Sequence, residues 1–236
     1  ALSLAAPASA DVVINEIMQN PSAVSDSFGE WIELYNSGES AVDIEGWTLR
    51  DDDFDSHVIS SGAPLLVPAG GFLVLGNNTD TTTNGGASVD YSYGSSWFIA
   101  NGADEVVLQD IFSNEVDRVE YDGGPQYPDP TGASMALIDP ALDNNLGENW
   151  CESTMTFGAG DSGTPGAAND CEPGGGGGTD PVARFIYEIQ GSGNAVTEPG
   201  SAVIVEAVVI GDYQEADQLA GFFIQEESVD EDGDAA

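Results

Sequence analysis

The 236-residue chain contains no lysine and only three arginines, against 42 acidic residues, so its formal net charge at pH 7 is -39. A charge of this sign repels nucleic-acid phosphates and anionic membrane surfaces at long range. We therefore expect no direct nucleic-acid binding by this chain. Two interpretations of the acidic surface stay open: a solvated surface of the kind found in marine or salt-loving bacteria, and a surface that carries calcium.

Motifs of common catalytic sites are also missing. The sequence has no Gly-x-Ser-x-Gly, no His-Glu-x-x-His and no phosphate-binding glycine loop followed by lysine. His57 is the only histidine, and a lone histidine in a loop is more often a surface residue than a ligand. We therefore assign no catalytic residue and no cofactor-binding residue to this chain.

Long apolar runs and helical periodicity are absent, which excludes a transmembrane segment and favours an all-β fold. Alternation of apolar and polar residues predicts short strands separated by turns. Pro68 cannot donate to a strand ladder and is expected in a turn or at an edge, and residues 77–90 are expected to form a loop. The predicted strands cover residues 12–17, 30–35, 42–49, two runs within 65–75, 97–99, 105–108, 116–121 and 134–138.

The clearest alternation lies around Trp31 and Trp47. Residues 30–35 predict a strand with one wet face and one buried face, and residues 42–49 repeat the pattern after a turn. We expect the two runs to pair as an antiparallel hairpin, with Trp31, Leu34, Ile44 and Trp47 mostly buried. Together these strands predict the opening of a β-sandwich.

Three blocks in this region carry a family resemblance. Ile-Asn-Glu-Ile at 14–17, Glu-Trp-Ile-Glu-Leu-Tyr-Asn at 30–36 and Val-Asp-Ile-Glu-Gly-Trp-Thr-Leu at 42–49 resemble the lamin tail domain of bacterial secreted proteins. The resemblance covers roughly residues 11–170. It implies an immunoglobulin-like β-sandwich, and it implies no activity, because one fold hosts many functions.

The first ten residues and the cysteines both point to secretion. Residues 1–10 end in Ala-Ser-Ala and look like the end of a signal peptide, although a disordered Ala-rich tail is the alternative. In a secreted chain, Cys151 and Cys171 favour one disulfide, worth about 3 kcal/mol in the chain-entropy model. Two free thiols or a redox pair fit less well, because the spacing is not Cys-x-x-Cys. We expect an extracellular location.

Residues 51–55 contain four aspartates in five positions. Such a density of carboxylates suits a hard cation, and Asp51, Asp53 and Asp55 are the candidate ligands of a weak calcium site. The spacing departs from that of an EF-hand loop, since the sixth position has no glycine and the twelfth no glutamate. An exposed acidic turn without metal is the alternative.

A glycine-rich linker, residues 172–180, separates residues 11–171 from a second β unit at 181–236. Trp150-Cys151, the Gly-Thr-Pro-Gly run at 163–166 and Cys171 resemble a segment that follows lamin tail domains in bacterial extracellular nucleases. By the same resemblance, residues 181–236 look like an incomplete OB-like domain. The nuclease domain that the resemblance implies belongs to the endonuclease/exonuclease/phosphatase class and requires a divalent metal.

Two functions remain open. In the first, the chain is the non-catalytic N-terminal region of a secreted nuclease acting on extracellular DNA, and serves display, tethering or partner binding. In the second, it is an interaction module of a cell-surface or matrix protein without nuclease activity. In either case we expect an unidentified protein or surface partner, and no cofactor in this chain apart from calcium.

Overall fold

The computed structural model describes residues 12–52, 55–171, 182–183, 203–204, 208–213 and 221–225. The chain divides into two compact units, residues 1–178 and 179–236. The predicted signal-peptide segment and the predicted linker lie outside the described residues. Within them, no helix is long and apolar enough to cross a membrane.

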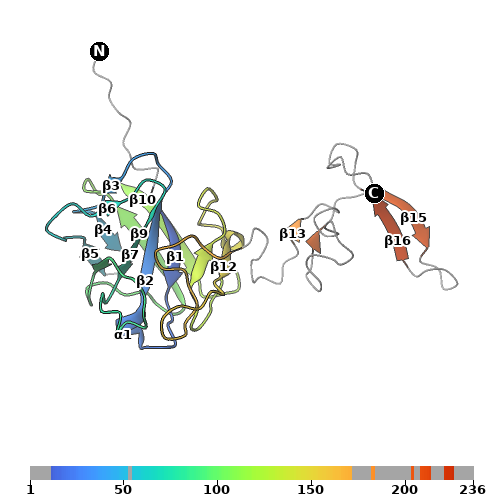
Figure 1. Cartoon of the computed structure of the whole chain (residues 1–236). Helices are drawn as coiled ribbons and strands as arrows, with labels where there is room; N and C mark the ends of the chain where they lie inside the picture. The colour runs from blue at the N-terminus through green and yellow to red at the C-terminus, as the bar shows by residue number, and fades with distance from the viewer. Residues whose placement is uncertain are drawn as a thin grey trace, which may run out of the picture. The chain divides into compact units, whose positions relative to one another are not determined.

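Two sheets form the first unit (Figure 1). The six-stranded sheet runs in the order β12 (Trp150–Glu152), β11 (Met135–Leu137), β1 (Val12–Met18), β2 (Trp31–Asn36), β7 (Phe72–Gly76) and β8 (Tyr91–Ser92). The four-stranded sheet runs in the order β10 (Glu115–Asp122), β9 (Ala103–Gln109), β4 (Thr48–Arg50) and β5 (Ser56–Val58). All pairs are antiparallel except β7 with β8.

Three small elements complete this unit. β3 (Val42–Asp43) pairs with β6 (Leu66–Val67), and Pro68 lies in the turn after β6, as the sequence predicts. A one-turn helix, α1 (Asp26–Gly29), precedes β2, and a 3-10 turn, η1 (Gly147–Asn149), precedes β12. The segment 97–99 was predicted as a strand and forms none, although Trp97 is fully buried.

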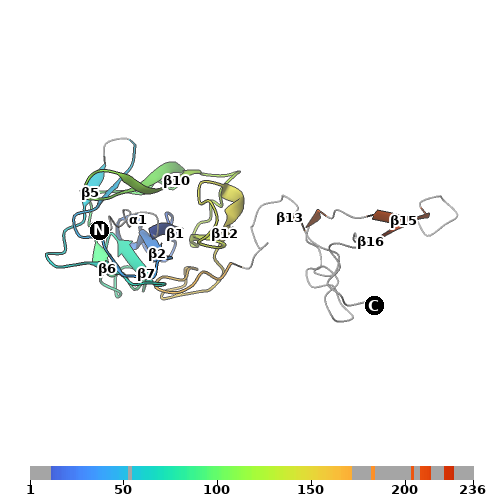
Figure 2. The same cartoon turned by 90° about the horizontal axis from the view of Figure 1, so that it is seen from above.

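The hydrophobic core lies between the two sheets. Figure 2 shows β5 and β10 in one layer and β2 and β7 in the other. Apolar side chains from both layers, and from the loops that close the ends, are almost completely shielded from solvent: Ile14, Leu34, Ile44, Leu49, Trp97, Val106 and Leu108 among them. The predicted all-β sandwich and the predicted burial of Trp31, Leu34, Ile44 and Trp47 are confirmed.

A β-bulge in β1 decides which side chains face the core. Ile14 pairs with Leu34 and Glu16 pairs with Glu33, so Asn15 is the extra residue. Because of that extra residue, Ile14 and Ile17 both join the core although they lie three positions apart. The bulge therefore turns Glu16 to the opposite face of the sheet.

The predicted hairpin between residues 30–35 and 42–49 is wrong. β2 pairs with β1 and β7, whereas β4 pairs with β5 and β9 in the other sheet. The chain between them crosses from one sheet to the other, and Ile44 and Trp47 are buried in the core on the way. Period-2 alternation depends on which side chains are buried, and it carries no information about which strand is the neighbour.

The predicted wet face of β2 is also wrong. Trp31, Ile32, Glu33 and Leu34 are all buried, so both faces of the strand are covered. A second apolar cluster lies on the outer face of the six-stranded sheet and consists of Met18, Trp31, Val74 and Ala87, with Val89 and Phe157 packed against it. Two segments supply this cover: the loop 77–90 and the segment after β12.

Four short strands are described in the second unit. β13 (Val182–Ala183) pairs in parallel with β14 (Val203–Ile204), and β15 (Val208–Tyr213) pairs in antiparallel with β16 (Gly221–Gln225). These strands agree with the second β unit that the sequence predicts for residues 181–236.

Candidate functional site

A depression of about 490 Å³ lies where β9 and β10 pair in the four-stranded sheet. Val106 and Val119 of these strands point into the core, so their neighbours Glu105 and Glu120 point outward. The loops after β4 and β10 form its walls. We call this depression the acidic groove, because it is lined mainly by carboxylates and tyrosines: Asp52, Asp104, Glu105, Glu120, Tyr121, Asp122 and Tyr127.

Two glutamates face each other on the floor of the acidic groove. Glu105 and Glu120 are directly opposite in the β9–β10 register, and like charges in such positions destabilise a sheet. Partial burial, together with the charges of Asp52, Asp104 and Glu120, raises the pKa of Glu105. The groove therefore offers an environment in which a positive charge from a ligand would be favourable.

The two arginines of the first unit are held at the rim of the acidic groove. Arg118 Nη1 lies 2.8 Å from Asp52 Oδ2 and Arg50 Nη1 lies 2.9 Å from Asp52 Oδ1. Arg118 also contacts Glu115. Hydrogen bonds from Arg118, and to a smaller extent from Arg50, lower the pKa of Asp52 to about 2. Among the described ion pairs, none involves Glu105 or Glu120.

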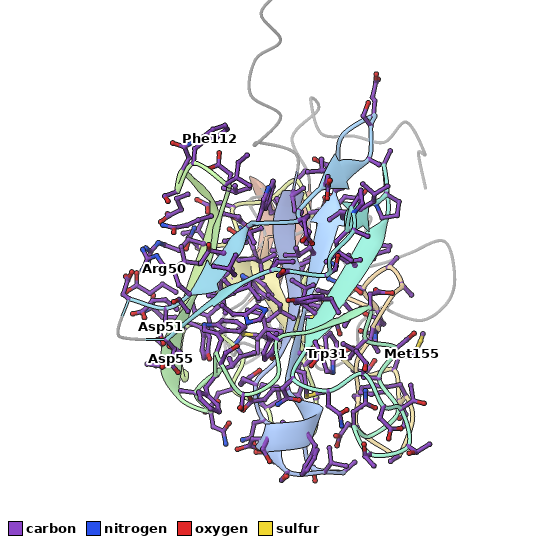
Figure 3. All side chains as sticks on the ribbon, turned by 90° about the vertical axis from the view of Figure 1, so that its left-hand side faces the viewer. Trp31, Arg50, Asp51, Asp55, Phe112 and Met155 are labelled. Carbon is purple, nitrogen blue, oxygen red and sulfur yellow. A yellow bond between two sulfur atoms is a disulfide. The ribbon has the colours of Figure 1, made fainter. Side chains whose placement is uncertain are left out.

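The predicted calcium ligands lie in the turn after β4. Asp51 N donates to the Asp55 carbonyl and Asp55 N donates to Asp51 Oδ1, both at 3.3 Å. Asp53 lies outside the described residues. Figure 3 shows Arg50, Asp51 and Asp55 on the side of the sandwich opposite Trp31 and Met155. In the part of the chain that is described, no group of three or more His, Cys, Asp or Glu side chains could hold a metal ion. Calcium binding by Asp51, Asp53 and Asp55 stays a prediction.

His57 lies in β5 and is bonded at both ring nitrogens, which the sequence did not indicate. Its Nδ1 is 2.6 Å from Ser96 Oγ and its Nε2 is 2.7 Å from Tyr91 Oη. Ser96 Oγ donates to the Tyr93 carbonyl, so the serine is a donor there and not an activated nucleophile. Partial burial lowers the pKa of His57. The histidine therefore links β5 to the segment 91–96 and has no catalytic geometry.

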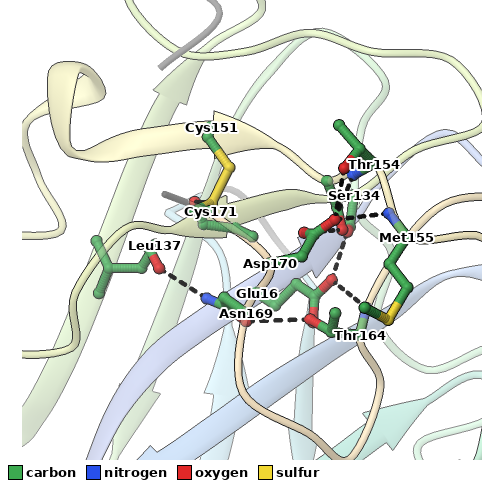
Figure 4. Close-up of a disulfide and its surroundings, with 12 residues drawn as sticks. Glu16, Ser134, Leu137, Cys151, Thr154, Met155, Thr164, Asn169, Asp170 and Cys171 are labelled. Carbon is green, nitrogen blue, oxygen red and sulfur yellow. Dashed lines mark hydrogen bonds between the residues drawn. A yellow bond between two sulfur atoms is a disulfide. The ribbon is translucent and has the colours of Figure 1, made fainter. Parts of the chain in front are cut away.

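The predicted disulfide is present. Cys151 and Cys171 are bonded, with their Cα atoms 6.0 Å apart. It ties the end of the segment 153–171 back to β12 (Figure 4). We call this segment the strap. Asp170 holds the first turn of the strap by accepting hydrogen bonds from Ser153, Thr154 and Met155.

The turn between β9 and β10 presents apolar side chains to solvent. Ile111 and Phe112 are 60% and 77% exposed, and Figure 3 shows Phe112 at one end of the sandwich. The turn is held by Asp110, whose carboxylate accepts hydrogen bonds from Phe112 N and Asn114 N. Exposed aromatic side chains on a held backbone are typical of protein-protein contact sites.

The chemistry of these features is that of binding. In the described part of the first unit, several charged side chains form ion pairs at the groove rim, and others accept backbone hydrogen bonds, as Asp110 and Asp161 do. The chain's one histidine is part of a structural network. The acidic groove and the Phe112 turn are both exposed, and both belong to the four-stranded sheet.

Comparison with known families gives one match. The family model described as the Lamin Tail Domain matches residues 5–123. These residues include β1 to β10, and so the whole four-stranded sheet with the floor of the acidic groove, and four strands of the six-stranded sheet. None of the curated proteins compared with the chain matches it. The chain therefore belongs to the Lamin Tail Domain family, a family of immunoglobulin-like protein-interaction modules.

Proposed function

We propose that residues 12–171 bind a basic segment of a partner protein in the acidic groove. The observation that supports this most directly is the pair Glu105 and Glu120, which face each other across two strands with no ion pair of their own among the described contacts. A lysine or arginine placed between them would offset a repulsion that costs the isolated sheet stability.

The net charge of the chain favours the same class of partner. With a formal charge of -39 and no lysine, the surface attracts cations and repels anions over distances of about a Debye length. Electrostatic attraction of this kind mainly raises the association rate, while close pairs in the groove provide selectivity. Anionic lipids and nucleic acids are disfavoured for the same reason.

Binding of a lysine-rich peptide tests this proposal. A fluorescein-labelled lysine-rich peptide should bind the full chain, and its glutamine-for-lysine counterpart should not. The double variant Glu105→Gln/Glu120→Gln should bind about fivefold more weakly, because exposed ion pairs contribute about 0.2–1 kcal/mol each. Fluorescence anisotropy at about 50 mM and about 200 mM salt also reports how many ion pairs form, since these are screened by salt.

The control for the groove is a variant with the same net charge. Glu39 and Glu152 are exposed glutamates outside the acidic groove. The double variant Glu39→Gln/Glu152→Gln should bind the peptide within about twofold of wild type, since only long-range attraction is reduced. Equal weakening by both double variants would show that net charge, and not the groove, attracts the peptide.

The larger protein is, on this proposal, a secreted nuclease of which this chain is the non-catalytic N-terminal region. Support comes from the resemblance of residues 150–171 to the corresponding segment of extracellular nucleases. The Cys151–Cys171 disulfide is compatible with an extracellular location. The groove would then position the nuclease on a basic partner. The alternative is that the chain is an interaction module without nuclease activity. This alternative is favoured if the reading frame beyond residue 236 encodes no metallonuclease domain.

The purified chain itself should not cleave DNA. Metal-dependent phosphodiester hydrolysis of the implied class needs at least two histidines beside a metal-bound carboxylate. This chain has only His57, which is engaged with Ser96 and Tyr91. Plasmid nicking assays with magnesium, manganese or calcium should show no product. Cleavage by the chain that disappears on chelation of the metal would place catalytic residues here and contradict the proposal.

A further inference from the structure

The strap covers the outer face of the six-stranded sheet. Thr164 and Asn169 contact β1, and Phe157 lies edge-on to Trp31 of β2, with ring centroids 6.1 Å apart. Asn169 also donates to the Leu137 carbonyl of β11 at 2.8 Å. The strap has no regular secondary structure longer than a single bridge. Backbone hydrogen bonds also attach the strap: Ala159 N donates to the Gly85 carbonyl, Ser162 N donates to the Gly132 carbonyl, and Ser134 N donates to the Ser162 carbonyl. In addition, the Asp161 carboxylate accepts hydrogen bonds from Ser22 N and Ala23 N.

Two fully buried carboxylates, Glu16 and Glu33, provide the central attachment. Glu16 accepts hydrogen bonds from Thr164 N at 2.8 Å and Thr164 Oγ1 at 2.9 Å, and from Ser134 Oγ (Figure 4). Glu33 accepts from Gly166 N at 2.6 Å and Asn15 Nδ2 at 2.9 Å. Three of these five donors belong to the strap. The two glutamates are direct partners across β1 and β2.

The surroundings of the pair contain no positive charge among the described residues. From β1, the segment before β11 and the strap, the groups that contact the pair are the neutral Asn15, Ser134, Thr164 and Gly166. The charged groups that act on it are acidic: Asp170 of the strap acts on Glu16, and Asp90, which bonds to β7, acts on Glu33. Arg50 and Arg118 form their ion pairs in the other sheet.

Two buried negative charges without a counter-charge are costly in a medium of low dielectric constant. Burial therefore raises the pKa of Glu16 to about 7, against the hydrogen bonds that lower it. Burial, followed by the charge of Glu16, raises the pKa of Glu33 to about 8. When the strap leaves, both carboxyl groups meet water, and each pKa returns toward about 4.3.

We propose that the strap is a pH-sensitive cover: it stays closed while the Glu16–Glu33 pair holds a proton, and opens when the pair is fully ionised. The closed form binds protons more tightly than the open form, so it is favoured at acidic pH. Its advantage is lost progressively as the pH rises from about 4.5 through 8. Opening uncovers the apolar cluster around Met18 and Trp31. The Cys151–Cys171 bond keeps both ends of the strap attached throughout.

Hydrogen exchange on the full chain tests this proposal. After correction for the intrinsic exchange rate, the protection factor of peptides covering residues 156–168 should fall at least tenfold between pH 6 and pH 9. Peptides from β9 and β10 serve as the internal reference and should change little. In parallel, NMR titration of the glutamate carboxyl carbons in the wild-type chain should show two groups titrating above pH 6.

Glu33→Gln is the decisive variant, because it removes one charge and retains an acceptor for Gly166. Between pH 6 and pH 9 its strap should lose clearly less protection than the wild-type strap, because only Glu16 still titrates in the variant. Glu152→Gln, an exposed change where β12 meets the strap, should keep the wild-type pH dependence. If Glu33→Gln does not fold, as judged by β9 and β10, Glu16→Gln makes the same test.

Three results would overturn the proposal. The first is a wild-type strap whose protection does not depend on pH, and the second is a pH dependence as large in the glutamine variants as in the wild-type chain. The third is full restoration of protection at pH 9 by calcium, with reversal by chelation, which would make the pair a cation site. If neither variant folds, the NMR titration of the wild-type glutamate carboxyl carbons tests the proposal. The absence of any glutamate that titrates above pH 6 would then contradict it.

Discussion

Replacement of Trp150 by alanine should lower the free energy of unfolding of the first unit by about 3–5 kcal/mol. Trp150 begins β12 and is 1% exposed, with its ring 6.3 Å from that of Tyr127. Its indole Nε1 donates to the Asn144 carbonyl at 2.8 Å. Asn144 in turn donates to Asp117 of β10 and to the Ile14 carbonyl of β1. The alanine variant would leave a large cavity where both sheets and the loop 139–149 meet.

A phenylalanine variant separates the two contributions of this side chain. Trp150→Phe keeps most of the apolar volume and loses the N–H donor, so its expected cost is about 1 kcal/mol. Met155→Ala, at an exposed position of the strap, should change stability by less than about 0.5 kcal/mol. Urea unfolding of the full chain, followed by circular dichroism, measures all three. A Trp150→Ala cost below about 1 kcal/mol would show that β12 is not part of the cooperative unit.

Burial of individual side chains was predictable from the sequence because it depends on local alternation. Trp31, Leu34, Ile44 and Trp47 were expected inside and are inside. The disulfide was also predictable, because the chain has two cysteines and its first ten residues resemble the end of a signal peptide. Both predictions need only the residue types in the sequence, and neither needs to know which segments lie side by side in the fold.

Local sequence patterns did not predict which strands pair with each other or which segments cover them. The expected hairpin failed because β2 and β4 belong to different sheets. The expected wet face of β2 failed because the strap, more than 110 positions later in the sequence, covers Glu33. A buried glutamate looks identical in sequence to a solvent-facing one, since alternation records polarity and not exposure. The bulge at Asn15 adds a further shift that no local pattern indicated.

The acidic groove was only partly accessible to sequence analysis. The runs 105–108 and 116–121 were predicted as strands, and counting outward from the turn between them brings Glu105 close to Glu120. The bulge near Glu115 shifts the register by one residue, so counting alone does not fix the pair. The walls of the groove come from Asp52 and from the loop that contains Tyr127. Those contacts depend on how the loops fold over the sheet.

Replacement of Gly158 by alanine should destabilise the first unit by about 3 kcal/mol or more, because the strap approaches the loop 77–90 closely at this glycine. A Cβ at Gly158 would overlap the Gly85 carbonyl oxygen and lie 2.7 Å from Gly86 Cα. Both are backbone atoms, so no side chain can move aside. The next residue, Ala159, donates its N–H to the same Gly85 carbonyl at 2.8 Å, which fixes the distance between the two segments. Insertion of a methyl group here forces a backbone shift of the kind that overpacked cores show.

The matched control for Gly158→Ala is Gly70→Ala. Gly158 and Gly70 both have a positive φ, +46° and +62°, so an alanine pays the same left-handed strain of about 1–2 kcal/mol at either position. A Cβ at Gly70 would meet nothing within 4 Å. The difference between the two variants in urea unfolding therefore measures the steric contact alone, and we expect it to exceed about 1 kcal/mol. Equal losses would mean that the strap can move away from Gly85 at little cost.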